Sequence, residues 1–333
     1  MKHTIYFILF CSILSLKSFA QEGKPIKIQS DRTIKDETRY EGATILAKVT
    51  KQVYMQHEGI EIWCDQAIYY GDDQFVKAFG NVRMKQGDTL TMSSNYAEYN
   101  GNTKFAYASD KVFLETPSNT LRTDTLFFDR LRQQAYYRSG GTVKDSTNTL
   151  TSKIGRYFME RKQYSFNTKV KIVNPENTVD SDRLDYYTEN GHAYLYGPST
   201  VKGKESTLYC ERGFYDTKVK TGYAIKNARI DYDNRTVFGD SIFYNSAIQF
   251  ASATNNIKVL DTANQSVITG HYAEVFKDKD SVFITKRALA ATLQENDSIY
   301  IHSDTLMVTG KPERRILNGF YDVRIYKSNM SGK

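Results

Sequence analysis

The side chains best able to do chemistry in this sequence are its histidines, and they are not spaced like a catalytic or metal site. Beyond the first 20 residues they are His57, His192, His271 and His302. No two have the His-x-x-x-His spacing of metal ligands, and we expect each in a turn or on the surface. The sequence has no Gly-x-Ser-x-Gly elbow and no phosphate-binding loop. These residues predict no enzyme, no cofactor and no metal site.

Four aspartates, Asp65, Asp124, Asp182 and Asp240, could be imagined as the carboxylate pairs of a glycosidase. Such pairs stand about 5 to 9.5 Å apart. The aspartates instead recur at one position of a repeat, where neighbouring units would lie roughly 10 Å apart if each adds two strands. A role at a corner of each unit explains their recurrence better. A carbohydrate-active enzyme on a β-helix stays open as a remote alternative.

The repeat that must position these residues has a period of about 29 residues. Its aromatic residues are separated by a step of 30 and then five steps of 29. The aromatic series is Tyr69, Tyr99, Phe128, Tyr157, Tyr186, Tyr215 and Tyr244. A small residue stands five positions before each one, and the small series is Cys64, Ser94, Thr123, Ser152, Ser181, Cys210 and Gly239. With Ser30 before this series and Thr269 and Ser303 after it, about ten units can be counted.

Each unit reads as two strands, the first of which bends. Apolar residues seven positions before the aromatic cannot share a face with it on one regular strand, because the spacing is odd. The small residue and a following Asp or Asn mark the point where the alternation slips. The second strand carries apolar pairs at i and i+2, as in Val82/Met84 and Val112/Leu114. Turns such as Glu189-Asn190-Gly191 separate the strands.

Stacking such units predicts an all-β fold, an elongated, bent antiparallel β-jellyroll in which each unit covers its neighbour. A parallel β-helix is less favoured, because its shorter Gly/Asp-rich coils are missing. Cys64 and Cys210 occupy the same repeat position and would stand roughly 50 Å apart, whereas a disulfide needs Cα atoms within about 7 Å. We expect each thiol to fill a small corner site.

Residues 1–20 have the pattern of a secretory signal peptide: Lys2 and His3, an apolar run, and a Ser18-Phe19-Ala20 ending. The exported chain, 21–333, would then carry a formal charge of +5 instead of +7. Its charges alternate in sign, which predicts a solvated surface and no nucleic-acid binding. The repeats form either one continuous region, 21–333, or two fused modules near 21–175 and 176–333.

Two segments resemble the OstA-like family, which includes the lipopolysaccharide-transport protein LptA and the N-terminal domain of LptD. Residues 26–32 read Ile-Lys-Ile-Gln-Ser-Asp-Arg, and residues 80–88 begin Gly-Asn-Val and end Gln-Gly-Asp. The resemblance implies a periplasmic β-jellyroll (a β-taco) that shields the acyl chains of lipid A. It also implies end-to-end joining with other Lpt-type proteins through edge strands, and a part in outer-membrane assembly.

On this resemblance, lipid would contact the apolar lining of the trough. The candidates are Ile62, Met92, Leu121, Leu150, Val179, Leu208 and Val237 of the first strands, and Val82, Val112 and Val170 of the second strands. The alternative is a structural or adhesive exported β-solenoid with a packed core and no lipid ligand. The sequence leaves open whether the trough is open or packed.

Overall fold

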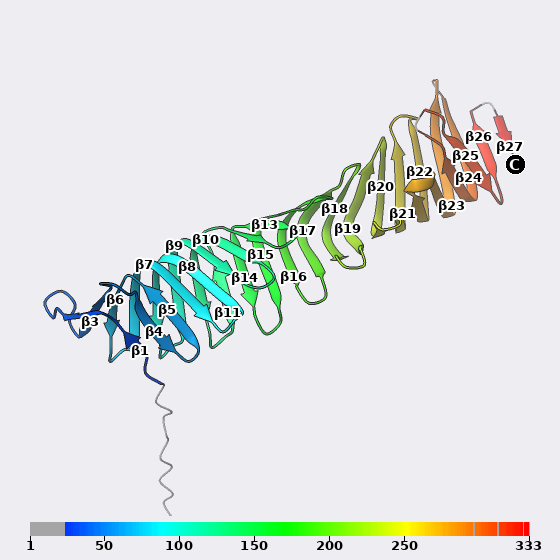
Figure 1. Ribbon diagram of the computed structural model, residues 1–333. Helices are drawn as coiled ribbons and strands as arrows, with labels where there is room; N and C mark the ends of the chain where they lie inside the picture. The colour runs from blue at the N-terminus through cyan, green and yellow to red at the C-terminus, as the bar shows by residue number, and fades with distance from the viewer. Residues whose placement is uncertain (1–23, 296, 312, 329, 333) are drawn as a thin grey trace, which may run out of the picture.

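The chain folds into one continuous antiparallel sheet that is bent along its whole length. A computed structural model describes residues 24–295, 297–311, 313–328 and 330–332. Every strand pairing in this part of the chain is antiparallel, and each strand pairs with those next to it in the repeat. Figure 1 shows the strands stacked along one long, twisting axis, from β1 at one end to β27 at the other. The predicted bent antiparallel stack is confirmed; the predicted signal peptide lies outside the described residues.

The strands of the first half are β1 (Lys27–Gln29), β2 (Arg32–Lys35), β3 (Ala43–Ala47), β4 (Val53–His57), β5 (Ile60–Cys64), β6 (Gln66–Tyr70), β7 (Phe75–Gln86), β8 (Leu90–Asn100), β9 (Phe105–Glu115), β10 (Thr120–Asp129), β11 (Gln134–Tyr137), β12 (Gly141–Lys144), β13 (Thr149–Ser152), β14 (Ile154–Phe158) and β15 (Gln163–Val173). Those of the second half are β16 (Thr178–Tyr187), β17 (His192–Lys202), β18 (Ser206–Asp216), β19 (Thr221–Tyr232), β20 (Arg235–Asn245), β21 (Phe250–Asp261), β22 (Ser266–Phe276), β23 (Ser281–Gln294), β24 (Asp297–Thr309), β25 (Ile316–Phe320), β26 (Arg324–Lys327) and β27 (Met330–Gly332). A short 3-10 turn, η1 (Lys277–Lys279), links β22 to β23.

The bend divides every unit into two walls that face each other across a core. We call the half that carries Ile62 and Met92 the aliphatic wall, and the half that carries Tyr69 and Tyr99 the aromatic wall. Long strands such as β8 cross both walls, whereas β5 and β6 are the two halves of one interrupted strand. A single cluster of buried apolar residues runs between the walls from Ile26 to Val308.

Two kinds of corner alternate along the sheet. In the first strand of a unit, inward residues are three apart at the corner, as in Ser94 and Ala97, so one residue bulges outward. In the return strand, two consecutive residues adopt left-handed φ, as in Asp110 (63°) and Lys111 (59°). Two residues therefore oppose one, which is the geometry of a β-bulge and bends the sheet. Gly80, with φ 72°, takes this conformation without the steric penalty of a Cβ.

The predicted corner chemistry is visible in repeated hydrogen bonds. The small residue donates its hydroxyl to the carbonyl two positions later, across the bulge. These bonds are Ser30 to Arg32 (2.7 Å), Ser94 to Tyr96 (2.9 Å), Thr123 to Thr125 (3.2 Å), Ser152 to Ile154 (3.0 Å), Ser181 to Arg183 (2.9 Å) and Ser303 to Thr305 (2.7 Å). On the outer surface of the corner, the Asn81 amide donates a hydrogen bond to the Asp65 carboxylate (2.6 Å), and the Asn256 amide donates one to the Asp240 carboxylate (2.9 Å). Both aspartates thus support bends.

One repeat position was assigned wrongly from the sequence. Gly270, and not Thr269, is the corner residue of its unit, because Gly270 pairs with Ile257 as Ser94 pairs with Val82. The spacing shifts by one there, so the aromatic position is taken by Val275. The sheet continues through β15 and β16, on either side of the predicted module boundary. The division into two modules stays a prediction.

Thr168 offers a test of the corner. This β-branched residue has φ 66° in the return strand, where a Cβ costs about 1 to 2 kcal/mol. We expect Thr168→Gly to raise the free energy of unfolding by about 1 kcal/mol, measured by urea denaturation. The matched change Thr151→Gly in the regular strand β13 should lower it, since glycine weakens a strand. A loss of stability in both variants would contradict the assigned strain.

Candidate functional site

The interior of the aliphatic wall is an unbroken ladder of aliphatic side chains. Each member pairs directly with the next across adjacent strands, so the ladder runs through every unit in one register. Its members are Ile28, Met55, Ile62, Met84, Met92, Leu114, Leu121, Val143, Leu150, Ile172, Val179, Val201, Leu208, Ile230, Val237, Val259, Ile268, Ala290, Ile301 and Ile325. No polar side chain interrupts this series.

The aromatic wall carries a ladder of a different kind, in which a large residue usually faces a small one. Tyr99 pairs with Ala106, and Ala106 pairs with Phe128. The same alternation continues through Ala193 beside Tyr215 and Gly222 beside Tyr244. The small partners leave room for the rings, which explains why one aromatic recurs in every two strands. Tyr99 and Phe128 are buried, whereas the later tyrosines are half-buried.

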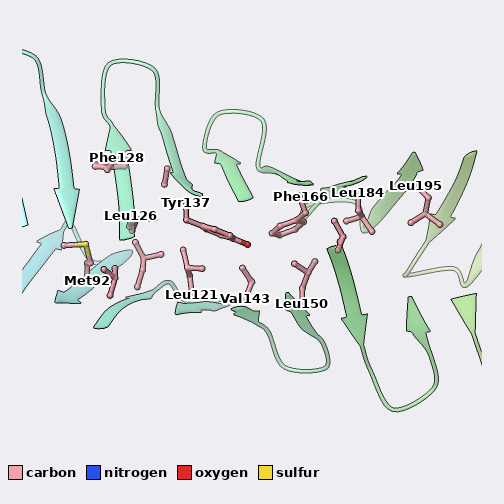
Figure 2. Packing of buried hydrophobic residues seen from close by; sticks show 14 of the residues in the cluster. Met92, Leu121, Leu126, Phe128, Tyr137, Val143, Leu150, Phe166, Leu184 and Leu195 are labelled. Atoms are coloured by element: carbon pink, nitrogen blue, oxygen red, sulfur yellow. The ribbon is translucent and has the colours of Figure 1, made fainter. Parts of the chain in front are cut away.

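Side chains from both walls fill the space between them. Figure 2 shows Leu121, Val143 and Leu150 on one wall and Tyr137 and Phe166 reaching toward them from the other. In the N-terminal third, an apolar pocket lined by Ile62, Val76, Met84, Met92, Tyr99 and Phe128 leaves about 20 Å³ that the centre of a water molecule can occupy. That is room for about one water molecule. The walls are closely packed in this third of the stack, whereas Val179, Val201, Leu208 and Ile230 of the middle units are only partly buried.

The ten predicted lipid-contacting residues all line this interior. Eight are buried: Ile62, Met92, Leu121, Leu150, Val237, Val82, Val112 and Val170. Val179 and Leu208 are partly buried and pack against the same cluster. The seven from the first strands belong to the aliphatic ladder, and the three valines lie one step deeper, next to the corner. The structure brings them together as a continuous lining; their contact with lipid stays a prediction.

The other residues considered for chemistry have structural positions. His57 is buried, contrary to the surface position expected, and shares hydrogen bonds with the Tyr99 hydroxyl (2.6 Å) and the Lys24 carbonyl (2.7 Å). Cys64 and Cys210 fill corner sites, and burial raises their pKa values to about 12 and about 11. Among the described residues, no three His, Cys, Asp or Glu side chains gather as a metal site would require.

The outer face of the aromatic wall bears a second row of rings that the sequence analysis did not identify. Phe79 and Tyr96 have ring centroids 5.1 Å apart, and Phe127 stacks on Tyr136 at 5.0 Å. Tyr107 joins these pairs through Phe127. Cross-strand aromatic pairs contribute roughly 0.2 to 1 kcal/mol each, so this row stiffens the wall from outside.

Ion pairs cross the mouth of the trough, where the hairpin turns of the two walls face each other. We call the turns of the aliphatic wall the acidic rim and those of the aromatic wall the basic rim. Each pair takes its carboxylate from the acidic rim. The pairs are Lys104 with Glu58 (2.7 Å), Arg130 with Glu58 (3.9 Å), Lys220 with Glu176 (3.6 Å), Lys277 with Glu205, and Arg315 with Asp261.

These pairs differ in exposure, and the pair of Lys220 and Glu176 is the one exposed on both sides. The side chains of Lys220 and Glu176 are 48% and 64% exposed, and such pairs contribute about 0 to 1 kcal/mol. Glu58 is more enclosed: its hydrogen bond with Lys104 holds the pKa of its carboxyl below the usual range. The mouth can accordingly open around Lys220 and Glu176 without a large loss of stability.

The C-terminal end of the mouth differs, because its ion pair is buried. Asp261 lies between Arg235 and Arg315, and all three side chains are less than a tenth exposed. Arg235 Nε stands 3.6 Å from the carboxylate, and Arg315 reaches it from the opposite rim. Two cations share one anion here, so the cluster keeps an excess positive charge.

The sequence analysis missed this mouth, although a signal was present. The acidic rim turns contain Glu58, Asp88, Asp145, Glu176, Glu205, Asp233 and Glu295, with Lys204 as their single basic residue. Sorting the turns into two alternating sets would have exposed the bias. The pairing itself joins residues 44 to 72 positions apart, which no local pattern reveals.

Comparison with known proteins agrees with this architecture. Residues 26–182 match the family model described as OstA-like protein. This segment of the chain is OstA-like. It contains the β1–β2 corner at Ser30 and the ladder as far as Val179. The resemblance predicted from residues 26–32 and 80–88 is thereby confirmed.

Among solved structures, the chain is similar to LptH from Pseudomonas aeruginosa, described as the LptA homologous periplasmic component of the conserved lipopolysaccharide transport device. The identity is 12%, the alignment covers 52% of this chain and 82% of LptH, and the TM-score is 0.15. No curated protein matches the chain. The described part of the chain has no helix with the length and apolar character to span a membrane.

The buried cluster generates a stability prediction. Asp261→Asn leaves Arg235 and Arg315 buried without an anion, which should destabilise the protein by about 3 to 5 kcal/mol. Glu176→Gln breaks an exposed pair and should change stability by less than about 1 kcal/mol. The measurements are urea unfolding and amide hydrogen exchange, with lost protection expected in β21 and β24. Equal effects of the two substitutions would show that Asp261 does not hold the mouth.

Proposed function

We propose that this OstA-like protein is a periplasmic lipopolysaccharide-binding and transport protein that aids outer-membrane assembly. The observation that carries the proposal is the aliphatic ladder, which runs uninterrupted from Ile28 to Ile325. The OstA-like match supports it through the lipopolysaccharide-transport members of that family. The signal-peptide pattern of residues 1–20 supports export. Nothing in the proposed role requires an active site.

The physical basis is the shielding of acyl chains. Exposing a chain of about a dozen carbons to water costs on the order of 10 kcal/mol, at about 0.8 kcal/mol per CH₂. The ladder offers nearly equivalent aliphatic surface at every unit. A chain bound between the walls could therefore shift along the stack with little change in free energy. Entry requires the walls to part, and the weak pairs of the mouth permit this.

Both ends of the stack suit partners that add a strand. At the N-terminal end, β1 pairs only with β4 and β2 only with β3; at the C-terminal end, β25 pairs only with β24 and β27 only with β26, within the described residues. Each therefore has an open edge of backbone donors and acceptors. We propose that other Lpt-type β-jellyroll proteins join these edges head to tail.

The packed interior favours a second candidate, a structural or adhesive β-stack without a lipid ligand. In the pocket between Ile62 and Phe128, only about 20 Å³ can hold the centre of a water molecule, which is too little for an acyl chain. The two candidates differ in what the walls do. A carrier must open, whereas a structural stack keeps its core closed at all times.

Tryptophan substitutions separate the two functions. If Leu121 and Leu150 contact lipid, Leu121→Trp and Leu150→Trp should weaken binding of a fluorescent lipid A analogue at least tenfold, because the ring fills the trough. Overpacking should also destabilise the fold by about 1 to 3 kcal/mol. Thr151→Trp, on the outward face of the same strand as Leu150, should leave lipid binding unchanged.

Mass spectrometry of the purified wild-type protein provides the direct measurement. We expect bound lipid that the analogue displaces. Absence of both bound lipid and analogue binding, with tryptophan variants that only lose stability, would reject the carrier and favour the structural stack.

A further inference from the structure

The cross-mouth ion pairs have a uniform polarity. All five contacts take the cation from the basic rim and the carboxylate from the acidic rim, between the β4–β5 turn and the β24–β25 loop. A mouth held only by scattered surface pairs would mix both orientations. The cations of these five contacts therefore stand along one lip of the trough, and each faces a carboxylate of the opposite lip.

Several guanidinium groups of this mouth have nitrogens without a partner. Arg130 Nε, Arg235 Nη2 and Arg315 Nε are buried and donate no hydrogen bond within the described residues. Arg130 already binds the Glu58 carbonyl (3.1 Å) and the Tyr99 hydroxyl (3.4 Å) through its other nitrogens. Arg235 and Arg315 share the single carboxylate of Asp261. These unused donors are suited to oxygens of an anion, since guanidinium binds phosphate and carboxylate in two-pronged geometry.

We propose that the basic rim is a binding site for the anionic headgroup of an amphiphile, and that it exchanges its intramolecular carboxylates for phosphate groups of the ligand when the mouth opens. This inference rests on the proposed function, since the acyl chains would lie between the walls. An anionic ligand restores every ion pair that opening breaks. A neutral one leaves Lys104, Lys220 and Lys277 without an anion, so the rim selects for charge as well as for acyl chains.

The two sides of the same ion pairs can be neutralised separately. The variant Glu176→Gln/Glu205→Gln removes the competing carboxylates, and Lys220→Gln/Lys277→Gln removes the cations; both break the same two pairs. For bisphosphorylated lipid A we expect the acid-side variant to bind about threefold to tenfold tighter than wild type and the base-side variant about threefold to tenfold weaker. For dephosphorylated lipid A the two variants should bind alike.

The controls lie on the outer surface. Glu211→Gln and Lys226→Gln break an ion pair of 2.6 Å at a corner, away from the mouth, and should leave both affinities unchanged. Equal shifts of the two rim variants with bisphosphorylated lipid A would show that the pairs act only as a latch and would overturn the headgroup site. Inorganic phosphate alone, bound as tightly as lipid A, would overturn the assignment to an amphiphile.

The inference and the proposed function fail differently. If wild type binds neither lipid A nor its dephosphorylated form, the carrier function is rejected and the headgroup site falls with it. If wild type binds both forms with equal affinity, the carrier function stands and only the headgroup site is rejected.

Discussion

The whole structure depends on one constraint, which is that every strand must keep its apolar side chains inside while it turns from one wall to the other. Side chains of a regular strand alternate strictly between its two faces. A strand that bent without a change of register would therefore point the apolar side chains of its second half outward. The one-residue slip after Ser94 and the left-handed pair Asp110-Lys111 solve this in the two strand directions. Once both corners exist, the ladders, the core and the two rims follow from stacking alone.

Much of this could be predicted from the sequence because it repeats. The odd spacing between Leu121 and Phe128 already requires a slip, and Thr123-Asp124 marks its place; the structure confirms both. The errors occur where the repeat is irregular or the contact is distant. Gly270 was missed because it follows Gly239 by 31 residues instead of 29. His57 was missed because its partners, Tyr99 and Lys24, are distant in the sequence. Whether the trough is packed depends on the distance between the walls, which no local pattern specifies.

Uniformity of the interior contrasts with asymmetry of the mouth. The ladder is similar from unit to unit, whereas the mouth is closed by partly enclosed pairs at Glu58, by the exposed pair of Lys220 and Glu176, and by the buried Asp261 cluster. Breaking a buried charge pair is far more unfavourable than breaking an exposed one. The walls should therefore separate more readily around Glu176 and Lys220 than beside β20 to β25, so the mouth varies along the stack more than the core does.

This asymmetry bears on how a closed trough can serve as a carrier. An acyl chain that enters must replace contacts between side chains such as Leu150 and Phe166 with contacts to itself, and apolar contacts of either kind exclude water equally well. The exchange then changes the free energy of the interior very little. The free energy of opening is set at the rims, where opening separates charges. If the ligand supplies new counter-ions to the rim, the loaded state is favoured. If the ligand supplies none, the closed state is favoured. If the stack is a carrier as proposed, the polar edge of the trough, more than its apolar lining, determines which amphiphile it holds.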